Sequence, residues 1–435
     1  MRVLKIGLAL ALLLTIAVGG IVWSSQQPLI PRVEAPPRSA FDPADVAKGA
    51  GLAALGDCDV CHTASGGSNY AGGRPIATPF GTIYSSNITP AIGTGLGHWS
   101  ENAFRRAMRD GVSRRGEHLF PAFPYDHFTH IDDADIHALY AFIMTRQPVE
   151  NFVSANRLIF PFNQRWLMSF WDLLFLDHAA VKSEPQQSAE WNRGAYLVEG
   201  LGHCGACHTP RNALGAEKTG EALAGGEAEG WVAPALNTDS PAPVPWDAAH
   251  LSTYLRQGWD AEHGAAAGPM QPVTHDLARA DEGDIRAIAA YLATLPGNAS
   301  PQRRERADKA LALASAEAET PAPPAGGDLG ATLFAGACAS CHVGGPAMVP
   351  PHGIDLSLST VVNQSDPRNA IRILLYGIRS DGERSGPWMP RFAGAFTDAQ
   401  LAALLTYIRG HYSSGPSWAD LAGKVADVRH SGTQP

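Results

Sequence analysis

The six cysteines of this 435-residue chain lie in three short motifs, and each motif ends in a histidine. The motifs are Cys58-Asp-Val-Cys61-His62, Cys204-Gly-Ala-Cys207-His208 and Cys338-Ala-Ser-Cys341-His342. Two thiols one helical turn apart can form thioethers with the two vinyl groups of a haem, and the adjacent imidazole can bind the iron as its proximal ligand. The sequence therefore predicts three covalently bound haems c.

Other sites built from paired cysteines fit this pattern less well. A thioredoxin-like dithiol does not require the histidine, and a zinc site needs four ligands brought together. A structural disulfide does not need the histidine either. Because the three motifs use every cysteine, none remains for an iron–sulfur cluster.

A haem that transfers electrons usually takes a methionine sulfur on its distal side, from a loop before the last helix of the domain. Met270 lies 62 residues after His208, and Met389 lies 47 residues after His342. Both stand in proline-flanked loops, so we expect them to be distal ligands rather than core methionines.

The first motif lacks an obvious distal methionine. The position 61 residues after His62 is Phe123, which cannot bind iron. Met108, 46 residues after His62, is the first candidate, although its helical spacing from Phe104 is also typical of a core residue. The alternatives are a histidine or an open position on the iron. The histidine candidates are His118, His127 and His130.

The sequence around the motifs repeats three times. A glycine lies eight to ten residues before the first cysteine of each motif, at Gly49, Gly194 and Gly330. Later in each repeat, apolar residues and one aromatic residue recur with helical spacing. These positions are Ile136, Leu139, Phe142 and Ile143; Ile285, Ile288, Tyr291 and Leu292; and Leu401, Leu404, Tyr407 and Ile408.

The repeats predict an all-α protein of three tandem cytochrome c domains. We expect the domains at 45–150, 186–298 and 328–412. They are joined by an aromatic connector at 151–185 and an Ala/Pro linker at 299–327, and a tail follows at 413–435.

The N-terminal residues 1–27 predict a membrane anchor. Arg2 and Lys5 precede 18 uncharged residues, Ile6 to Trp23, which is about enough helix to span a bilayer. We favour an N-terminal transmembrane helix over a cleaved signal, because no small-residue cleavage site follows. The basic residues at the N-terminus would keep this end of the chain in the cytoplasm. The haem domains would then lie on the periplasmic side of the inner membrane.

Charge and composition exclude other classes. The chain has 33 basic and 42 acidic residues, a net charge of −9, which does not suit a nucleic-acid binder. Its apolar content of 45% and aromatic content of 8% are too high for a disordered chain.

Beyond the motifs, residues 45–412 resemble the three-haem cytochrome c subunits of membrane-bound bacterial dehydrogenases. The resemblance rests on Pro79–Pro90, Arg109–Val112, Tyr140–Ile143, Gly205–Arg211, Trp231–Leu236 and Asn369–Gly377. It implies that the chain is not an enzyme by itself. It would pass electrons from a catalytic dehydrogenase subunit to ubiquinone or a terminal oxidase.

The subtype depends on Phe120–Thr129. Subunits of quinoprotein alcohol dehydrogenases and of flavin gluconate or sorbitol dehydrogenases typically carry a methionine ligand where this chain has Phe123. The sequence here is more similar to subunits that accompany molybdenum-cofactor enzymes, namely aldehyde dehydrogenase, isoquinoline oxidoreductase and nicotinate dehydrogenase. The resemblance therefore implies a molybdenum-cofactor partner and an iron–sulfur subunit.

Three alternatives remain open. The chain could serve an alcohol or gluconate dehydrogenase, act as an autonomous haem enzyme with an open first haem, or shuttle electrons without a dedicated partner. The aromatic segment 156–177 could lie in the membrane interface, contact a catalytic subunit or pack on its own haem domain.

Overall fold

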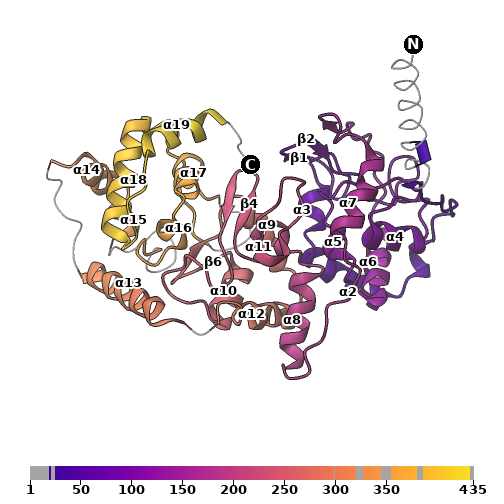
Figure 1. Ribbon diagram of the computed structural model, residues 1–435, viewed down its shortest axis with the longest axis horizontal. Helices are drawn as coiled ribbons and strands as arrows, with labels where there is room; N and C mark the ends of the chain where they lie inside the picture. Colours follow the sequence, from indigo (N-terminus) through magenta and orange to yellow (C-terminus); the bar gives the residue numbers. More distant parts are fainter. Residues whose placement is uncertain are drawn as a thin grey trace, which may run out of the picture. The chain divides into compact units, whose positions relative to one another are not determined.

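A computed structural model describes residues 19–20, 25–297, 299–319, 327–343, 354–379 and 386–431. The chain divides into two compact units (Figure 1). Unit 1 consists of Met1–Lys182 and Glu199–His203 and contains the first motif, whereas unit 2 consists of Ser183–Val198 and Cys204–Pro435 and contains the second and third.

Unit 1 contains short helices and one small antiparallel sheet of order β1-β2-β3. Its elements are η1 (Arg38–Ala40), α2 (Pro43–Leu55), α3 (Cys58–His62), β1 (Pro75–Thr78), β2 (Gly81–Tyr84), α4 (Glu101–Asp110), α5 (Tyr125–Phe128), α6 (Asp133–Met144), β3 (Arg157–Leu158), η2 (Arg165–Leu167) and α7 (Met168–Phe175).

Unit 2 contains most of α8 and all later elements, including two two-stranded antiparallel sheets, β4-β5 and β6-β7. These elements are α8 (Ala189–Glu199), α9 (Gly205–His208), η3 (Thr219–Glu221), β4 (Gly226–Ala228), β5 (Trp231–Ala233), α10 (Ala248–Gln257), β6 (Trp259–Asp260), β7 (Gly264–Ala265), α11 (Met270–Leu277), α12 (Glu282–Leu292), α13 (Pro301–Glu319), α14 (Leu329–Ala337), α15 (Ala339–His342), α16 (Thr360–Asn363), α17 (Arg368–Tyr376), α18 (Asp398–Tyr412) and α19 (Leu421–Ser431).

The helix ends follow from capping residues in the sequence. Asp42 accepts a hydrogen bond from the backbone of Ala44 at the start of α2, where Pro43 occupies the first position. A capping box of Thr397 and Gln400 begins α18, because each side chain bonds to the other residue's backbone nitrogen.

The same close helix contact occurs at the glycine that precedes each cysteine motif. A Cβ added at Gly49 of α2 would lie 2.0 Å from the carbonyl oxygen of Ala138 in α6. The corresponding distances are 1.9 Å for Gly194 of α8 against α12, and 2.3 Å for Gly330 of α14 against α18. Since no side chain fits there, glycine lets each helix pair cross backbone to backbone.

The aromatic residue predicted in each repeat lies at this crossing. The Cβ atoms of Phe142, Tyr291 and Tyr407 each lie within 2.8 Å of the position that a glycine Cβ would occupy. The apolar positions predicted around them are buried: Ile136, Ile285, Leu401 and Leu404 are 0% exposed, and Leu139 is 1% exposed. The predicted helix faces are therefore confirmed.

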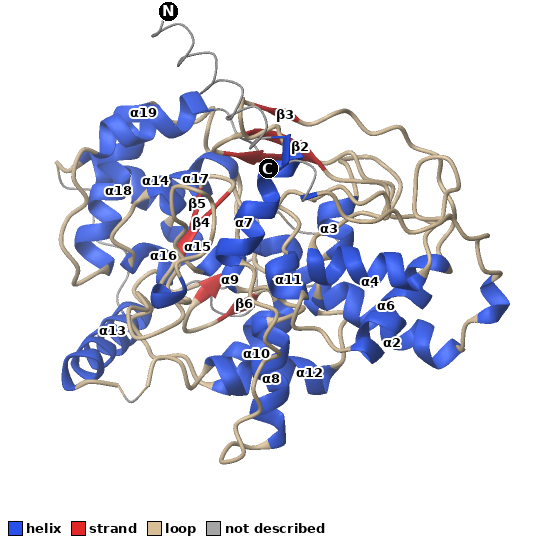
Figure 2. Cartoon of the chain, turned by 45° about the vertical axis from the view of Figure 1, so that its right-hand side comes forward, coloured by secondary structure: helices blue, strands red, loops and turns tan. Residues whose placement is uncertain are grey.

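The prediction of an all-α fold is wrong. The described residues include seven strands, which Figure 2 shows as short red segments among the helices. The longest pairing joins β1 and β2, where Ile76 faces Ile83 and Ala77 faces Thr82. The β-branched residues in this segment favour extended backbone over helix.

The predicted N-terminal transmembrane helix is also not upheld. Among the residues described, no helix has both the length and the apolar character needed to span a membrane. Within the predicted span, residues 6–18 and 21–23 lie outside the described residues.

Most of the predicted linker is helical. Residues Pro301–Glu319 form α13, whose sequence is rich in alanine, arginine and glutamate, which all favour helix. The proline-rich remainder, 320–326, lies outside the described residues.

Candidate haem-binding sites

Each motif histidine forms a hydrogen bond through Nδ1 to a backbone carbonyl that follows it in the sequence. His62 donates to Ser86 O at 2.6 Å, and His208 donates to Pro234 O at 2.7 Å. In the third motif, His342 donates to Ile354 O at 3.1 Å. Because a carbonyl only accepts, the Nδ1 atom must carry the proton, and the Nε2 lone pair is left for a metal.

Burial favours the same neutral form of these rings. It lowers the pKa of His62, His208 and His342 below the ordinary histidine value, although the carbonyl hydrogen bond opposes the shift in each case. A neutral imidazole with a second-sphere acceptor on Nδ1 is the usual form of a histidine that binds a metal.

The cysteines lie on or beside three short helices, α3, α9 and α15. All six are among the described residues; Cys338 is buried, Cys341 is exposed, and the other four are partly buried. Burial, with a smaller contribution from neighbouring Cys341, raises the pKa of Cys338 to about 11. Paired thiols beside a neutral histidine form the donor set of haem c, so these residues fit that group.

The structure places Met270 and Met389 where chain segments lead into helices. Met270 is the first residue of α11, and Met389 forms an isolated antiparallel bridge with Ile378 before α18. Both are partly buried, and Met389 packs against the hydrophobic core of the third-motif region. Their assignment as distal ligands remains a prediction.

The first-motif candidates lie in different surroundings. Met108 is 6% exposed on the inner face of α4, beside Phe104 and Ala107. Phe123 is partly buried and packs against Phe128 with ring centroids 5.3 Å apart. Met108 remains the predicted ligand.

His118 is already bonded through both ring nitrogens. Its Nε2 donates to Ser25 O at 2.8 Å, and its Nδ1 donates to the carboxylate of Asp172 at 2.9 Å. The other oxygen of Asp172 accepts from the Tyr125 hydroxyl at 2.7 Å. The hydrogen bond to Asp172 is the largest cause that raises the pKa of His118, so this ring is poorly suited to bind iron.

The other two histidine candidates also have structural surroundings. His127 forms a hydrogen bond from Nδ1 to Glu199 O at 2.8 Å. His130 is partly buried, and its Nδ1 has no hydrogen-bond partner among the described residues. Burial lowers the pKa of His130, which keeps its ring neutral. The Nδ1 atom of His130 is therefore chemically able to bind a metal.

Helix α7 of the aromatic connector has one buried face and one exposed face. Met168 and Trp171 of α7 are buried, and the Trp171 ring lies 5.8 Å from that of Tyr125. On the other side, Leu173 and Leu174 are 82% and 66% exposed. Its inner face therefore packs on unit 1, as one of the sequence hypotheses proposed.

Some residues of the sites give no signal in the sequence. The acceptors Ser86, Pro234 and Ile354 act through backbone carbonyls, so their side chains carry no motif. Asp172 stands in the sequence only as a charge within an apolar segment. Its pairing with His118 joins positions 54 residues apart.

Comparison with known proteins gives the family of the chain. The cytochrome c family matches residues 46–147 and 327–411. The chain is 45% identical to a nicotinate dehydrogenase subunit of Pseudomonas putida over 97% of its own length, but it spans only 34% of that protein. It therefore covers about a third of this relative.

Two further relatives match along most of both chains. The gluconate 2-dehydrogenase cytochrome c subunit of Pantoea cypripedii is 34% identical, over 89% of this chain and 90% of that protein. The cytochrome c subunit of alcohol dehydrogenase (quinone) from Gluconacetobacter polyoxogenes is 34% identical, over 90% of this chain and 85% of that protein. With covalent haem c as its implied cofactor, the chain belongs to the family of dehydrogenase cytochrome c subunits.

Proposed function

We propose that this chain is the electron-transfer subunit of a dehydrogenase complex and carries three covalent haems. It has no substrate chemistry of its own in this proposal. The observation that carries it is the threefold repetition of one arrangement: a Cys-x-x-Cys-His motif whose histidine is held by a carbonyl through Nδ1. The haem group supplies the one-electron chemistry, and the protein holds its iron and sets its surroundings.

We further propose that the catalytic partner is of the molybdenum-cofactor type, with an iron–sulfur subunit. Two observations support this choice. Phe123 replaces the methionine expected in subunits of alcohol and gluconate dehydrogenases. The nicotinate dehydrogenase relative is also more similar, at 45% identity, than the gluconate and alcohol dehydrogenase relatives, at 34%. The substrate would then be an aldehyde or a nitrogen heterocycle.

The electron acceptor in this proposal is ubiquinone or a terminal oxidase, and the haem domains work at the periplasmic face of the inner membrane. The location is supported by Arg2 and Lys5 before a long uncharged stretch, which is also typical of an export signal.

The partner can be identified by purification. The chain would be tagged, extracted gently from membranes of its native host and assayed for co-purified metal and organic cofactors. Molybdenum together with iron–sulfur subunits is the expected result. A quinone-type cofactor or a flavin without molybdenum would overturn the partner type and favour an alcohol or sugar dehydrogenase.

The proposal also distinguishes a relay from an autonomous haem enzyme. A relay in which every iron has two protein ligands should bind carbon monoxide or cyanide slowly at all three haems. Rapid binding at one haem would indicate an open iron and would contradict the proposed function for that haem.

A further inference from the structure

Within unit 2, side-chain contacts join the region that carries the second motif to the region that carries the third. On one side, Asn369 of α17 is 7% exposed. Its Nδ2 donates to Val232 O at 2.8 Å, and its Oδ1 accepts from Val232 N at 2.9 Å. The side chain thus pairs with β5 as a neighbouring strand would, which fixes α17 against the second-motif region.

Trp231 lies at the centre of this internal interface. It is 7% exposed, and the guanidinium carbon of Arg372 lies 5.7 Å from its ring centroid. A Cβ added at Gly268 would lie 2.3 Å from the indole, so the ring packs directly on the backbone two residues before Met270. Trp231 therefore contacts both the Met270 loop and α17.

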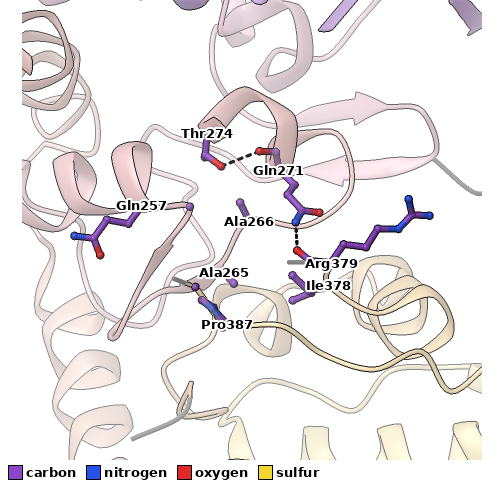
Figure 3. Close-up of a pocket in the computed structure, with 10 residues that line it drawn as sticks. Gln257, Ala265, Ala266, Gln271, Thr274, Ile378, Arg379 and Pro387 are labelled. Atoms are coloured by element: carbon purple, nitrogen blue, oxygen red, sulfur yellow. Dashed lines mark hydrogen bonds between the residues drawn. The ribbon is translucent and has the colours of Figure 1, made fainter. Parts of the chain in front are cut away.

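The two methionine loops are also joined by hydrogen bonds (Figure 3). The Nε2 atom of Gln271, the residue after Met270, donates to Arg379 O. The residue before Arg379 is Ile378, which exchanges two backbone hydrogen bonds with Met389, at 3.0 and 2.9 Å. The Gln271 side-chain hydrogen bond and the Ile378–Met389 backbone bridge thus connect the chain segments that carry the two predicted distal ligands.

The backbone of Gln271 is bonded within its own helix. The Thr274 hydroxyl donates to Gln271 O at 2.9 Å within α11, as Figure 3 shows. On the opposite side, a Cβ added at Gly377 would lie 2.3 Å from Met389 O, so the end of α17 is packed on the Met389 loop. Neither loop can move away without breaking these contacts.

We propose that Gln271 and Trp231 are positioning residues that hold the Met270 and Met389 loops together, so that the second and third haems exchange electrons directly. The inference rests on the proposed function. One electron leaves the ferrous iron of one haem and reduces the ferric iron of the other. No bond forms or breaks, and the total charge of the pair is unchanged.

The test compares two glutamines that line the same pocket, Gln271 and Gln257. The full haem-loaded chain would carry Gln271→Ala, and the matched control would carry Gln257→Ala, on the exposed end of α10. A light pulse would deliver one electron, and the absorbance bands would report how fast it equilibrates between the second and third haems. The potentials of both haems would be measured in each variant.

Electron exchange slows as the distance between two haems increases, so we expect the Gln271→Ala variant to equilibrate severalfold more slowly than the parental chain. The Gln257→Ala control should keep the parental rate. Gln271→Leu, which keeps the side-chain bulk but removes the N–H donor, should show the same loss if Gln271→Ala does not fold. Trp231→Phe should slow the exchange as well.

The results separate this inference from the proposed function. If Gln271→Ala and Gln271→Leu keep both Met-ligated spectra and both potentials but exchange electrons at the parental rate, the positioning role is overturned. If the parental chain carries no haem at the second or third motif, the proposed function fails before the question of exchange arises. A loss of thermal stability with an unchanged rate would overturn the positioning role as well, because the contact would then be purely structural.

Discussion

A single backbone carbonyl sets the orientation of each motif histidine. The three acceptors are Ser86, Pro234 and Ile354, which lie between 12 and 26 residues after their histidines. This separation means that a loop must fold back over the motif before the ring is fixed. At the scale of residues, iron binding therefore depends on loop backbone as much as on the motif.

The distal ligands can be tested one at a time. Met270→Ala and Met389→Ala should each remove one histidine–methionine absorption signature, because alanine has no donor atom for iron. Covalent haem should remain in both variants, since the thioether cysteines are untouched. Absorption near the methionine-to-iron band and haem staining after denaturing electrophoresis would measure the two effects. If a variant kept all of its methionine-to-iron absorption, that assignment would be wrong.

His118 gives a pH-dependent prediction. Its pKa is raised in the folded chain, first by the hydrogen bond to Asp172, so the protonated ring stabilises the fold. That contribution is fully present below the unfolded histidine pKa of about 6.5 and is lost as pH rises through the higher folded value. The parental protein should therefore lose more thermal stability than His118→Gln between slightly acid and alkaline pH.

Differential scanning calorimetry across this pH range would measure the effect. The first-haem spectrum should not change in His118→Gln, because both ring nitrogens of His118 are engaged by Asp172 and Ser25. Equal pH profiles for parent and variant would show that the buried pair does not contribute. A changed first-haem spectrum would instead make His118 a ligand.

At the scale of elements, the glycine that precedes each cysteine motif determines how closely two helices cross. Gly49 and Gly51 lie on the same helix, α2, but only Gly49 faces a neighbour: a Cβ at Gly51 would meet nothing within 4 Å. These two positions therefore form a matched pair for testing the crossing.

Gly49→Ala should lower the free energy of unfolding by about 1–3 kcal/mol, the usual cost of an overpacked contact. Gly51→Ala should raise it by up to about 1 kcal/mol, because alanine favours helix over glycine. Chemical denaturation of the haem-loaded chain would compare the two. Equal stability of the two variants would contradict the close crossing of α2 and α6.

The helix pairs could be predicted from the sequence, but the small sheets could not. The repeated apolar positions at Ile136, Ile285 and Leu401 mark faces that are fully buried in the structure. The β1–β2 hairpin spans only Pro75–Tyr84 and turns at Pro79-Phe80, which lacks the Asn-Gly type of signal that marks tight hairpins. A few β-branched residues there gave no periodic pattern.

At the scale of the whole molecule, the second and third motifs share one compact unit while the first lies in another. The sequence repeats predicted three tandem domains, but they gave no sign that Asn369 would pair with β5 or that Gln271 would reach Arg379. Contacts between repeats depend on side chains that differ from one repeat to the next. Periodicity within a repeat therefore could not reveal them.

The central claim is that this chain binds three haems covalently, one at each motif. Intact-mass spectrometry of the full chain, produced with the haem-attachment machinery, tests it most directly. We expect a mass increase of three haems for the parental chain and of two for each variant in which one motif's cysteines become alanines. A parental chain that carried two haems or fewer, with the same count when one motif was removed, would contradict the account.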